Sequence, residues 1–187
     1  MNMDKYNLTQ LRKHGEDVWV RAQVSIRRPQ LVTLGSHVAI DEFFVATTAL
    51  DIGNHVHIST HVSVIGGAKG LLKMGNFTNI ATKGTVICIS DEFKGHGFIA
   101  APGIPEEYLD RSIVGSVTFE DFANLGANVT ILPGVTLPQG TVIGACSLVR
   151  KSDALEPWTI YAGNPLRKIS KRPRENILAY AKKLGYA

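Results

Sequence analysis

The chain has 187 residues, of which 44% are hydrophobic and 19% charged, with a net charge of +4. This length suits one domain with a substantial core, and the composition excludes a disordered tail. No run of 18 apolar residues predicts a membrane span, and residues 1–5 lack the apolar core of a signal peptide. Two cysteines, Cys88 and Cys146, are too few for a disulfide framework, so we expect a reducing compartment, the cytoplasm.

The N-terminal segment, residues 1–33, predicts a short helix and one irregular coil. A capping asparagine and a glycine stop frame the helix over residues 7–14. Residues 18–26 alternate in polarity like strands, but they do not join the period that follows.

From residue 34 an aliphatic side chain recurs at every sixth position. A period of six fits neither a helix nor a plain strand. It fits short strands separated by tight corners, repeated so that equivalent side chains stack. Two unbroken runs carry the period: Leu34, Ile40, Ala46, Ile52, Ile58 and Val64, then Leu125, Ile131, Leu137, Ile143, Val149 and Leu155. Roughly sixteen hexads, at three per coil, predict about five triangular coils.

The register breaks after Ser90, and a long excursion runs over about residues 91–116. Loops that a rigid scaffold positions often carry function. This one holds four titratable side chains within seven positions: Asp91, Glu92, Lys94 and His96. The alternative for His96 is that it only hydrogen-bonds the loop to a neighbouring subunit.

Stacking makes residues eighteen positions apart share a corner, which places His37 above His55 and puts His61 on the next corner. Such histidines could bind a metal. The interpretation that we favour is a set of exposed corner residues, and we assign no metal ligand.

The C-terminal segment, residues 170–187, predicts a helix. Pro173 suits its first turn and Gly185 its end. Its apolar stripe follows the helical period: Ile177, Tyr180, Ala181 and Leu184. Basic residues concentrate between positions 150 and 183, which indicates either a phosphate or acidic partner or a solvated face.

Two stretches carry a resemblance to a known family. Residues 125–151, LGANVTILPGVTLPQGTVIGACSLVRK, and residues 161–169, YAGNPLRKI, resemble the hexapeptide-repeat acyltransferases, and the likeness covers residues 34–169. It implies an all-β fold, a left-handed parallel β-helix of hexapeptide repeats. It also implies a homotrimer with active sites at subunit interfaces, a small-molecule acceptor and no nucleic acid partner.

The excursion narrows the subgroup. Its start at residues 90–93, SDEF, and its finish at residues 105–108, PEEY, look like sugar acyltransferases of surface-polysaccharide pathways. The resemblance implies an acetyl-CoA-dependent N-acetyltransferase that acts on a nucleotide-linked amino-dideoxy sugar, as in O-antigen biosynthesis. An O-acetyltransferase of the galactoside or maltose type is the alternative. The sequence leaves the sugar, the nucleotide and the acyl length open.

Acyl transfer from a thioester needs a base and an oxyanion donor but no covalent acyl-enzyme. Both cysteines are therefore interpreted as structural. The resemblance implies that His96, or alternatively Glu92, is the base, and that Ser90 and Asp91 shape the acceptor pocket.

The resemblance also implies where coenzyme A binds. Small residues would let the pantetheine arm approach the backbone: Gly126, Ala127, Gly144, Ala145 and Ser147. Lys151 and Arg167 match the cations that hold the phosphate-rich head, with Arg150 and Lys168 as second choices. Asn164 would border the adenine end.

Two other classes compete with the acyltransferase. A metal enzyme of the γ-carbonic anhydrase type needs three histidines that converge across an interface, and His55, His57 and His61 are the candidates. A purely structural β-helix would need neither the excursion nor the Asn-Pro-x-Arg ending.

Overall fold

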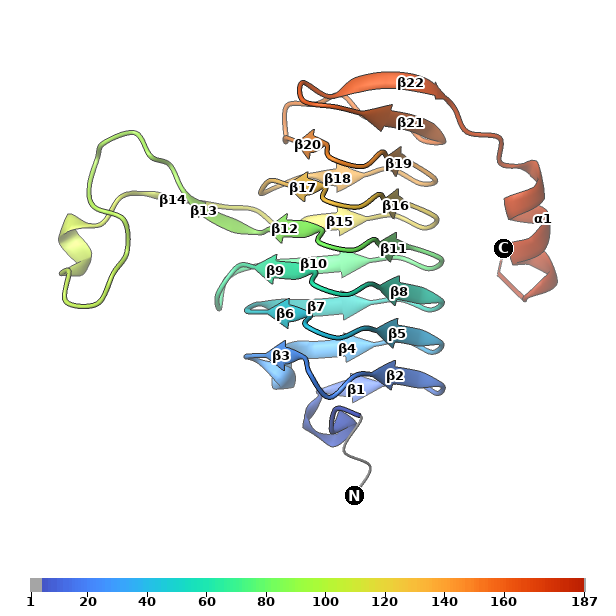
Figure 1. Cartoon of the computed structure of the whole chain (residues 1–187), viewed down its shortest axis with the longest axis horizontal. Helices are drawn as coiled ribbons and strands as arrows, with labels where there is room; N and C mark the ends of the chain where they lie inside the picture. Colours follow the sequence, from blue (N-terminus) through green and yellow to red (C-terminus); the bar gives the residue numbers. More distant parts are fainter. Residues whose placement is uncertain (1–4, 187) are drawn as a thin grey trace.

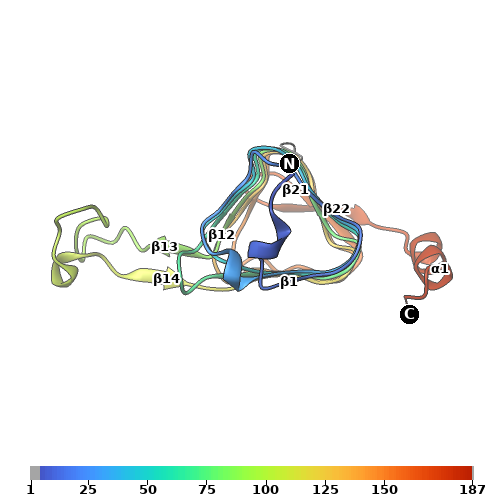
Figure 2. The same cartoon turned by 90° about the horizontal axis from the view of Figure 1, so that it is seen from below.

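The structure is a computed structural model that describes residues 5–186, so residues 1–4 of the predicted N-terminal segment and residue 187 of the predicted helix lie outside the described residues. Three sheets form the sides of a triangular prism, visible end-on in Figure 2. The prediction of an all-β parallel β-helix is confirmed. No helix in residues 5–186 is long and apolar enough to cross a membrane.

The three sheets are numbered in the order in which the chain meets them. Sheet 1 has six strands: β1 (Lys13–His14), β4 (Val32–Leu34), β7 (Ala49–Ile52), β10 (Leu71–Met74), β15 (Val117–Phe119) and β18 (Thr136–Leu137). Sheet 2 has eight: β2 (Val18–Val20), β5 (Val38–Ile40), β8 (Val56–Ile58), β11 (Asn79–Ile80), β16 (Asn124–Leu125), β19 (Val142–Ile143), β21 (Thr159–Ala162) and β22 (Arg167–Lys171). Sheet 3 has six: β3 (Ser25–Ile26), β6 (Val45–Ala46), β9 (Ser63–Ile65), β12 (Thr85–Ile87), β17 (Thr130–Ile131) and β20 (Leu148–Val149).

The core is the column of hexad residues inside the prism. Of the twelve aliphatics that carry the period, eleven are at most 2% exposed, and Leu155 packs against them from the edge. Burial of this continuous column is the main driving force for stacking, because no single coil can bury its aliphatic face alone. The six-residue period therefore identified the core correctly.

The stack has about seven coils rather than the predicted five. The first coil is regular, because β1, β2 and β3 pair in parallel with the second coil. Its residues lie twenty positions before their partners in the second coil, instead of eighteen. The first coil therefore does not follow the six-residue period. The predicted helix over residues 7–14 is also wrong, since only the 3-10 turn η1 (Leu8–Gln10) forms and β1 follows directly.

Three corners join the sheets, and each is a column of stacked turns. The first corner leads from sheet 1 to sheet 2, the second from sheet 2 to sheet 3, and the third from sheet 3 back to sheet 1. Left-handed backbone conformations mark the first corner at Asp17, His37, His55, Phe77, Phe122, Gly140 and Trp158, and the second at Phe43, His61, Lys83, Asn128 and Cys146.

The first corner carries a ladder of aromatic rings. The predicted pairing of His37 with His55 is confirmed, with ring centroids 4.6 Å apart. Phe77 stacks on His55 at 4.7 Å and Phe122 on Phe77 at 5.2 Å. Tyr186, beyond the C-terminal helix, meets His55 and Phe77 edge-on.

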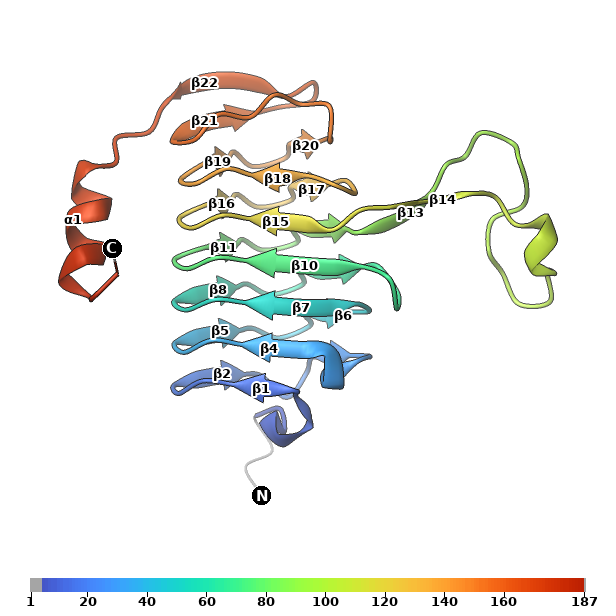
Figure 3. The same ribbon diagram turned by 180° about the vertical axis from the view of Figure 1, so that it is seen from behind.

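The excursion leaves the third corner as an antiparallel ribbon, formed by β13 (Ile89–Asp91) and β14 (Ser112–Val114). Figures 1 and 3 show it projecting from the prism, with the 3-10 turn η3 (Glu106–Tyr108) near its tip. The other 3-10 turn, η2 (Pro29–Leu31), lies in the first coil. The predicted break after Ser90 is therefore correct to within about two residues.

The C-terminal segment begins later as a helix than predicted. β22 runs back antiparallel along β21, and the helix α1 spans Glu175–Lys183 rather than residues 170–187. Pro173 precedes the helix instead of forming its first turn. Helix α1 lies beside the first corner (Figure 1), where Ile177 and Ala181 pack on Phe77, Phe122 and Trp158.

Candidate active site

Near the C-terminal end the second corner is built from small residues, and successive turns stack closely. A Cβ atom on Gly126 would lie 2.6 Å from the Ala145 nitrogen, and one on Gly144 would lie 2.9 Å from the Ala162 Cβ. Real Cβ atoms do not approach other atoms so closely, so these turns stack only with glycine. Ala127 is half-buried and Ala145 is exposed on the outside of this corner, which leaves a smooth surface of backbone.

Ser147 holds this corner together and does not face outward. It is 3% exposed. Its hydroxyl donates to the Gly144 carbonyl at 2.6 Å and accepts from the Gly163 N–H at 2.8 Å. Both its donor and an acceptor site are used. The Ser147 hydroxyl therefore points into the turn and not to the outside of the corner, and its contact with coenzyme A stays a prediction.

The turn between β21 and β22 ends the second corner and exposes two predicted residues. Asn164 and Arg167 are both exposed, and Arg167 pairs in register with Ala162 across the ribbon. Arg167 therefore stands directly beside the small-residue corner. This places the predicted head-binding cation one turn above the predicted pantetheine surface.

Part of the basic C-terminal cluster is already paired. Lys168 Nζ lies 2.9 Å from the Glu156 carboxylate, and Lys171 Nζ lies 2.6 Å from it. Hydrogen bonds from Lys171 and then Lys168 lower the pKa of Glu156 to about 2. Arg150 contacts Asp153 at 3.2 Å. Of the four predicted cations, only Lys151 and Arg167 make no ion pair with the residues that the structure describes.

Lys151 lies on the third corner, above the neck of the excursion. Its side chain covers Gly134, where a Cβ atom would lie 3.0 Å from the Lys151 Cδ. Gly115, at the end of the excursion, stacks beneath Gly134 and closes the neck through a 2.9 Å hydrogen bond from its N–H to the Cys88 carbonyl.

The strand pairing in the ribbon of the excursion determines on which face each predicted acceptor residue lies. Ser90 lies opposite Ile113 and Asp91 opposite Ser112. Because side chains alternate along an extended strand, Ser90 and Glu92 share one face and Asp91 points to the other. The Ser90 hydroxyl donates to the Asp91 carbonyl at 3.2 Å.

The two candidate bases differ in how firmly they are held. The Glu92 side chain is 23% exposed, its Oε2 lies 3.9 Å from Lys94 Nζ, and its N–H donates to the Arg111 carbonyl at 2.8 Å. His96 is exposed, and nothing in residues 5–186 hydrogen-bonds to its ring. The structure therefore positions Glu92 on the ribbon and leaves His96 on its outer loop.

The predicted site residues fall into two groups in one chain. The excursion and Lys151 belong to the third corner, and the small residues with Asn164 and Arg167 belong to the second. Sheet 3 lies between these corners (Figure 2). One chain does not bring the two groups together.

Comparisons with known proteins cover most of the chain. No family model matches the sequence. The chain is 30% identical over 169 residues to a putative lipopolysaccharide biosynthesis O-acetyl transferase, WbbJ, of Escherichia coli, covering 86% of this chain and 79% of the relative. It is 28% identical over 164 residues to the Escherichia coli dTDP-4-amino-4,6-dideoxy-D-glucose acyltransferase, covering 86% and 82%.

The solved structures include a variant of AntD, an N-acyltransferase from Bacillus cereus, in complex with dTDP-4-amino-4,6-dideoxyglucose and coenzyme A. Its TM-score is 0.88 at 30% identity, over 99% of both chains. This chain belongs to the hexapeptide-repeat β-helix acyltransferases. The predictions of the family and of an acyltransferase activity are confirmed.

The two cysteines of this acyltransferase have different surroundings, one inside the prism and one on the second corner. Burial raises the pKa of the Cys88 thiol, which donates to the Leu71 carbonyl at 3.3 Å. Cys146 is exposed at the second corner, in a left-handed conformation. A buried thiol with a raised pKa is a poor nucleophile, which agrees with transfer that needs no acyl-enzyme.

The three histidines of the metal hypothesis occupy different places. His55 stacks in the ladder of the first corner, His57 Nε2 lies 2.9 Å from Asp41 on sheet 2, and His61 lies against Phe43 on the second corner. Within residues 5–186 no three side chains that could hold a metal ion come together. This arrangement is not that of a three-histidine centre in one chain.

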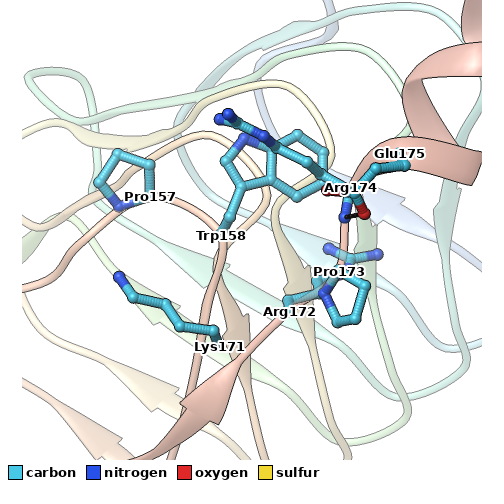
Figure 4. A pocket seen from close by; sticks show the side chains of 7 residues that line it. All are labelled: Pro157, Trp158, Lys171, Arg172, Pro173, Arg174 and Glu175. Atoms are coloured by element: carbon cyan, nitrogen blue, oxygen red, sulfur yellow. Dashed lines mark hydrogen bonds between the residues drawn. The ribbon is translucent and has the colours of Figure 1, made fainter.

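The structure also reveals a cavity that the sequence did not indicate, at the first corner of the acyltransferase. Its volume is about 530 Å³. Figure 4 shows its lining: Pro157, Trp158, Lys171, Arg172, Pro173, Arg174 and Glu175. Arg172 donates to the carbonyls of Phe122 (2.8 Å) and Gly140 (3.0 Å), and burial lowers its pKa. Arg172 therefore fastens the segment before α1 to the prism.

Proposed function

We propose that this enzyme transfers an acyl group from acyl-CoA to the amino group of a dTDP-linked 4-amino-4,6-dideoxy sugar. One observation carries the proposal: the chain matches AntD from end to end, excursion and C-terminal segment included, at a TM-score of 0.88. AntD is an N-acyltransferase that was crystallised with such a sugar nucleotide and coenzyme A. The sequence match to the Escherichia coli acyltransferase supports the same acceptor.

The reaction needs direct attack within a ternary complex. The amine nitrogen attacks the thioester carbonyl, a new C–N bond forms, the C–S bond breaks, and coenzyme A leaves as the thiol after a proton moves to it. A base must take a proton from the acceptor ammonium. Glu92 and His96 remain the two candidates, and Ser90 and Asp91 on the ribbon line the acceptor.

The donor binds along the second corner in this proposal. Glycines at positions 126 and 144 allow the pantetheine arm to lie against the backbone, beside Ala127 and Ala145. Arg167 and Asn164 contact the phosphate-rich head of coenzyme A from one side, and Lys151 contacts it from the other. Supporting this, Lys151 and Arg167 are the two cations of the predicted set that carry no ion pair among residues 5–186.

Each active site then takes residues from two neighbouring chains of a homotrimer. The support is geometric, since the donor and acceptor groups of one chain lie on opposite edges of sheet 3. A cyclic trimer brings the third corner of one chain to the second corner of the next, because its interfaces are heterologous.

The acyl length is a finer part of the proposal. The sequence led us to expect acetyl-CoA. One AntD complex contains dTDP and 3-hydroxybutyryl-CoA, so a longer donor is the second to test. Comparing kcat/KM for the two donors at a fixed acceptor concentration decides between them.

O-acetylation of a sugar is the second candidate function, favoured by the 30% identity to WbbJ. The name of this relative also supports a role in building surface polysaccharide, which we propose for either activity. The two activities differ in the acceptor atom alone.

The test offers the purified enzyme acetyl-CoA with dTDP-4-amino-4,6-dideoxyglucose or with its 4-hydroxy analogue, and reads the products by mass spectrometry. We expect a gain of one acetyl group on the amino sugar and none on the analogue. Acetylation of the analogue alone would show that the enzyme is an O-acetyltransferase.

A further inference from the structure

Asp110 is the one charged residue among the buried residues of the described chain. It lies on the excursion, two positions before β14, and is 8% exposed. Every other buried polar residue in that set is a threonine or a serine. Burying a carboxylate is costly unless a cation or several hydrogen bonds compensate for the lost water.

The chain itself supplies little compensation. Asp110 Oδ1 accepts one hydrogen bond, from the Arg111 N–H at 2.8 Å. Within residues 5–186 no lysine, arginine or histidine lies within 4.0 Å of this carboxylate, whereas Glu92 and Asp153 each have such a partner. An ionised carboxylate has about four acceptor positions, so most of those of Asp110 are unused.

One oxygen of Asp110 keeps some contact with solvent. In the described residues the Thr48 hydroxyl is the only side-chain polar atom that is both fully occluded and without a partner. Asp110 Oδ2 has no hydrogen-bond partner within residues 5–186, so it is not fully occluded, although the residue as a whole is buried.

The backbone around Asp110 fixes its position. Its N–H donates to the Phe98 carbonyl at 2.8 Å. Gly97 passes so close to the Leu109 carbonyl that no side chain fits there. Asp110 therefore sits at the crossing of two strands of the excursion, where its side chain has a defined direction.

A second carboxylate shares this face of the ribbon. Asp91 lies opposite Ser112, and Asp110 is two residues from Ser112. Residues two apart on an extended chain point to the same side, and Asp110 precedes β14 by two residues, so we place Asp91 and Asp110 on the same side of the ribbon. Within residues 5–186 neither carboxylate forms an ion pair, and two such carboxylates would select a positively charged donor of hydrogen bonds.

We propose that Asp110 binds the ammonium group of the acceptor sugar and so makes the enzyme choose an amine over a hydroxyl. This inference rests on the proposed function. Asp110 holds the nitrogen in place through Oδ2, and the base that takes its proton is a separate group. Asp91 supplies the second oxygen of the ammonium site.

The test is Asp110→Asn, which keeps an oxygen for the Arg111 N–H and removes the charge. We expect the Kd for dTDP-4-amino-4,6-dideoxyglucose, measured by titration calorimetry, to rise about 10- to 100-fold, as loss of a charged hydrogen bond predicts. The Kd values for dTDP and for acetyl-CoA should change less than about twofold. Glu107→Gln, an exposed carboxylate on the same excursion, is the matched control and should bind all three ligands as the wild type does.

A second comparison starts from the wild-type enzyme alone, so its first result does not depend on the variant folding. Wild type should bind the amino sugar at least about tenfold more tightly than the 4-hydroxy analogue, and Asp110→Asn should abolish this preference. A wild-type preference below about threefold, or a folded Asp110→Asn that retains the preference, overturns the assignment of Asp110. If the wild type binds neither sugar nucleotide, the proposed function fails as well; if it acylates the amine and Asp110→Asn does so equally well, only the assignment fails.

Discussion

The prism buries its hexad side chains, whereas the excursion exposes several large apolar side chains to solvent. In the prism, residues such as Ile58 and Ile131 are fully buried. In the excursion, Phe93 is 69% exposed, Phe98 64% and Tyr108 56%. The prism thus closes on itself, and the excursion has an apolar surface that its own chain does not cover. Large exposed apolar patches mark surfaces that meet another molecule.

The two regions also differ in what holds their backbone. Neighbouring coils of the prism pair along all three sheets, whereas the excursion has a single two-stranded ribbon, β13 with β14. Such a ribbon is marginally stable by itself. The prism is a complete scaffold in one chain, and the difference supports our proposal that the excursion completes its packing, and the active site, against a second chain.

Removing the excursion should separate the two regions most completely. The change replaces residues 91–112 by Asn-Gly, a pair that closes a two-residue hairpin between the paired residues Ser90 and Ile113. We expect acyl transfer to fall by more than about 1,000-fold, since base and acceptor residues are lost together. The circular dichroism spectrum should remain that of a β-protein. Turnover within about tenfold of the wild type would show that the chemistry lies elsewhere.

Substituting the two candidate bases singly should give the next largest effect. Glu92→Gln and His96→Gln keep similar shapes and remove proton acceptance. The true base should lower kcat about 100- to 10,000-fold and remove one limb of its pH profile. The other variant serves as the matched control, with kcat close to that of the wild type. If neither variant changes kcat, the excursion positions the acceptor but holds no base.

The hexad period made the prism predictable from sequence, because each coil repeats the same arrangement of buried aliphatic side chains. The buried column from Leu34 to Val149 and the stacking of His37 on His55 both followed from counting residues. The first coil was predicted to be irregular because its spacing of twenty residues breaks the count. The late start of α1 was missed because Arg167–Lys171 pairs with β21 as a strand, a tertiary contact that local propensity does not encode.

The candidate site was less predictable where the period stops. Asp110 carries no signal of its own in the sequence, since its burial depends on the segment at Phe98 crossing it. The resemblance placed Ser147 beside coenzyme A, and the structure adds that the turn folds its hydroxyl back onto Gly144 and Gly163. Residue types indicated the chemistry, and only the three-dimensional turn gave the direction of each side chain.

A matched pair of isoleucines tests the contrast in burial. Ile131 is fully buried and Ile113 is 45% exposed. Ile131→Ala should lower the free energy of unfolding by about 2–5 kcal/mol, and Ile113→Ala should change it by less than about 0.5 kcal/mol. Denaturant titration at a concentration where the chains are separate measures both. Equal losses would mean that the excursion is part of the core.

The smallest expected effect concerns pH at the first corner. Burial, and secondarily the charge of His37, lowers the pKa of His55 from its usual 6.5. Below pH 6.5 the His55 ring therefore binds a proton more readily in the unfolded chain than in the folded one. The free energy of unfolding is therefore highest above pH 6.5 and falls as the pH drops below it. His55→Phe, which continues the stack to Phe77, should lose less stability between pH 7.5 and 5.5, as thermal unfolding at each pH would show. A parallel loss in both proteins would remove His55 as the cause.

Complementation between two inactive variants tests most directly whether each active site is built from two chains. One variant carries Asp91→Asn with Glu92→Gln and His96→Gln on the excursion, and the other carries Ala145→Trp, which blocks the exposed second corner. Each homotrimer should be inactive. Co-expressed with different tags and purified through both, every mixed trimer contains one intact site of three, so activity should return to about one third of the wild type. Mixed trimers with no activity above that of the parent variants would contradict a site shared between chains.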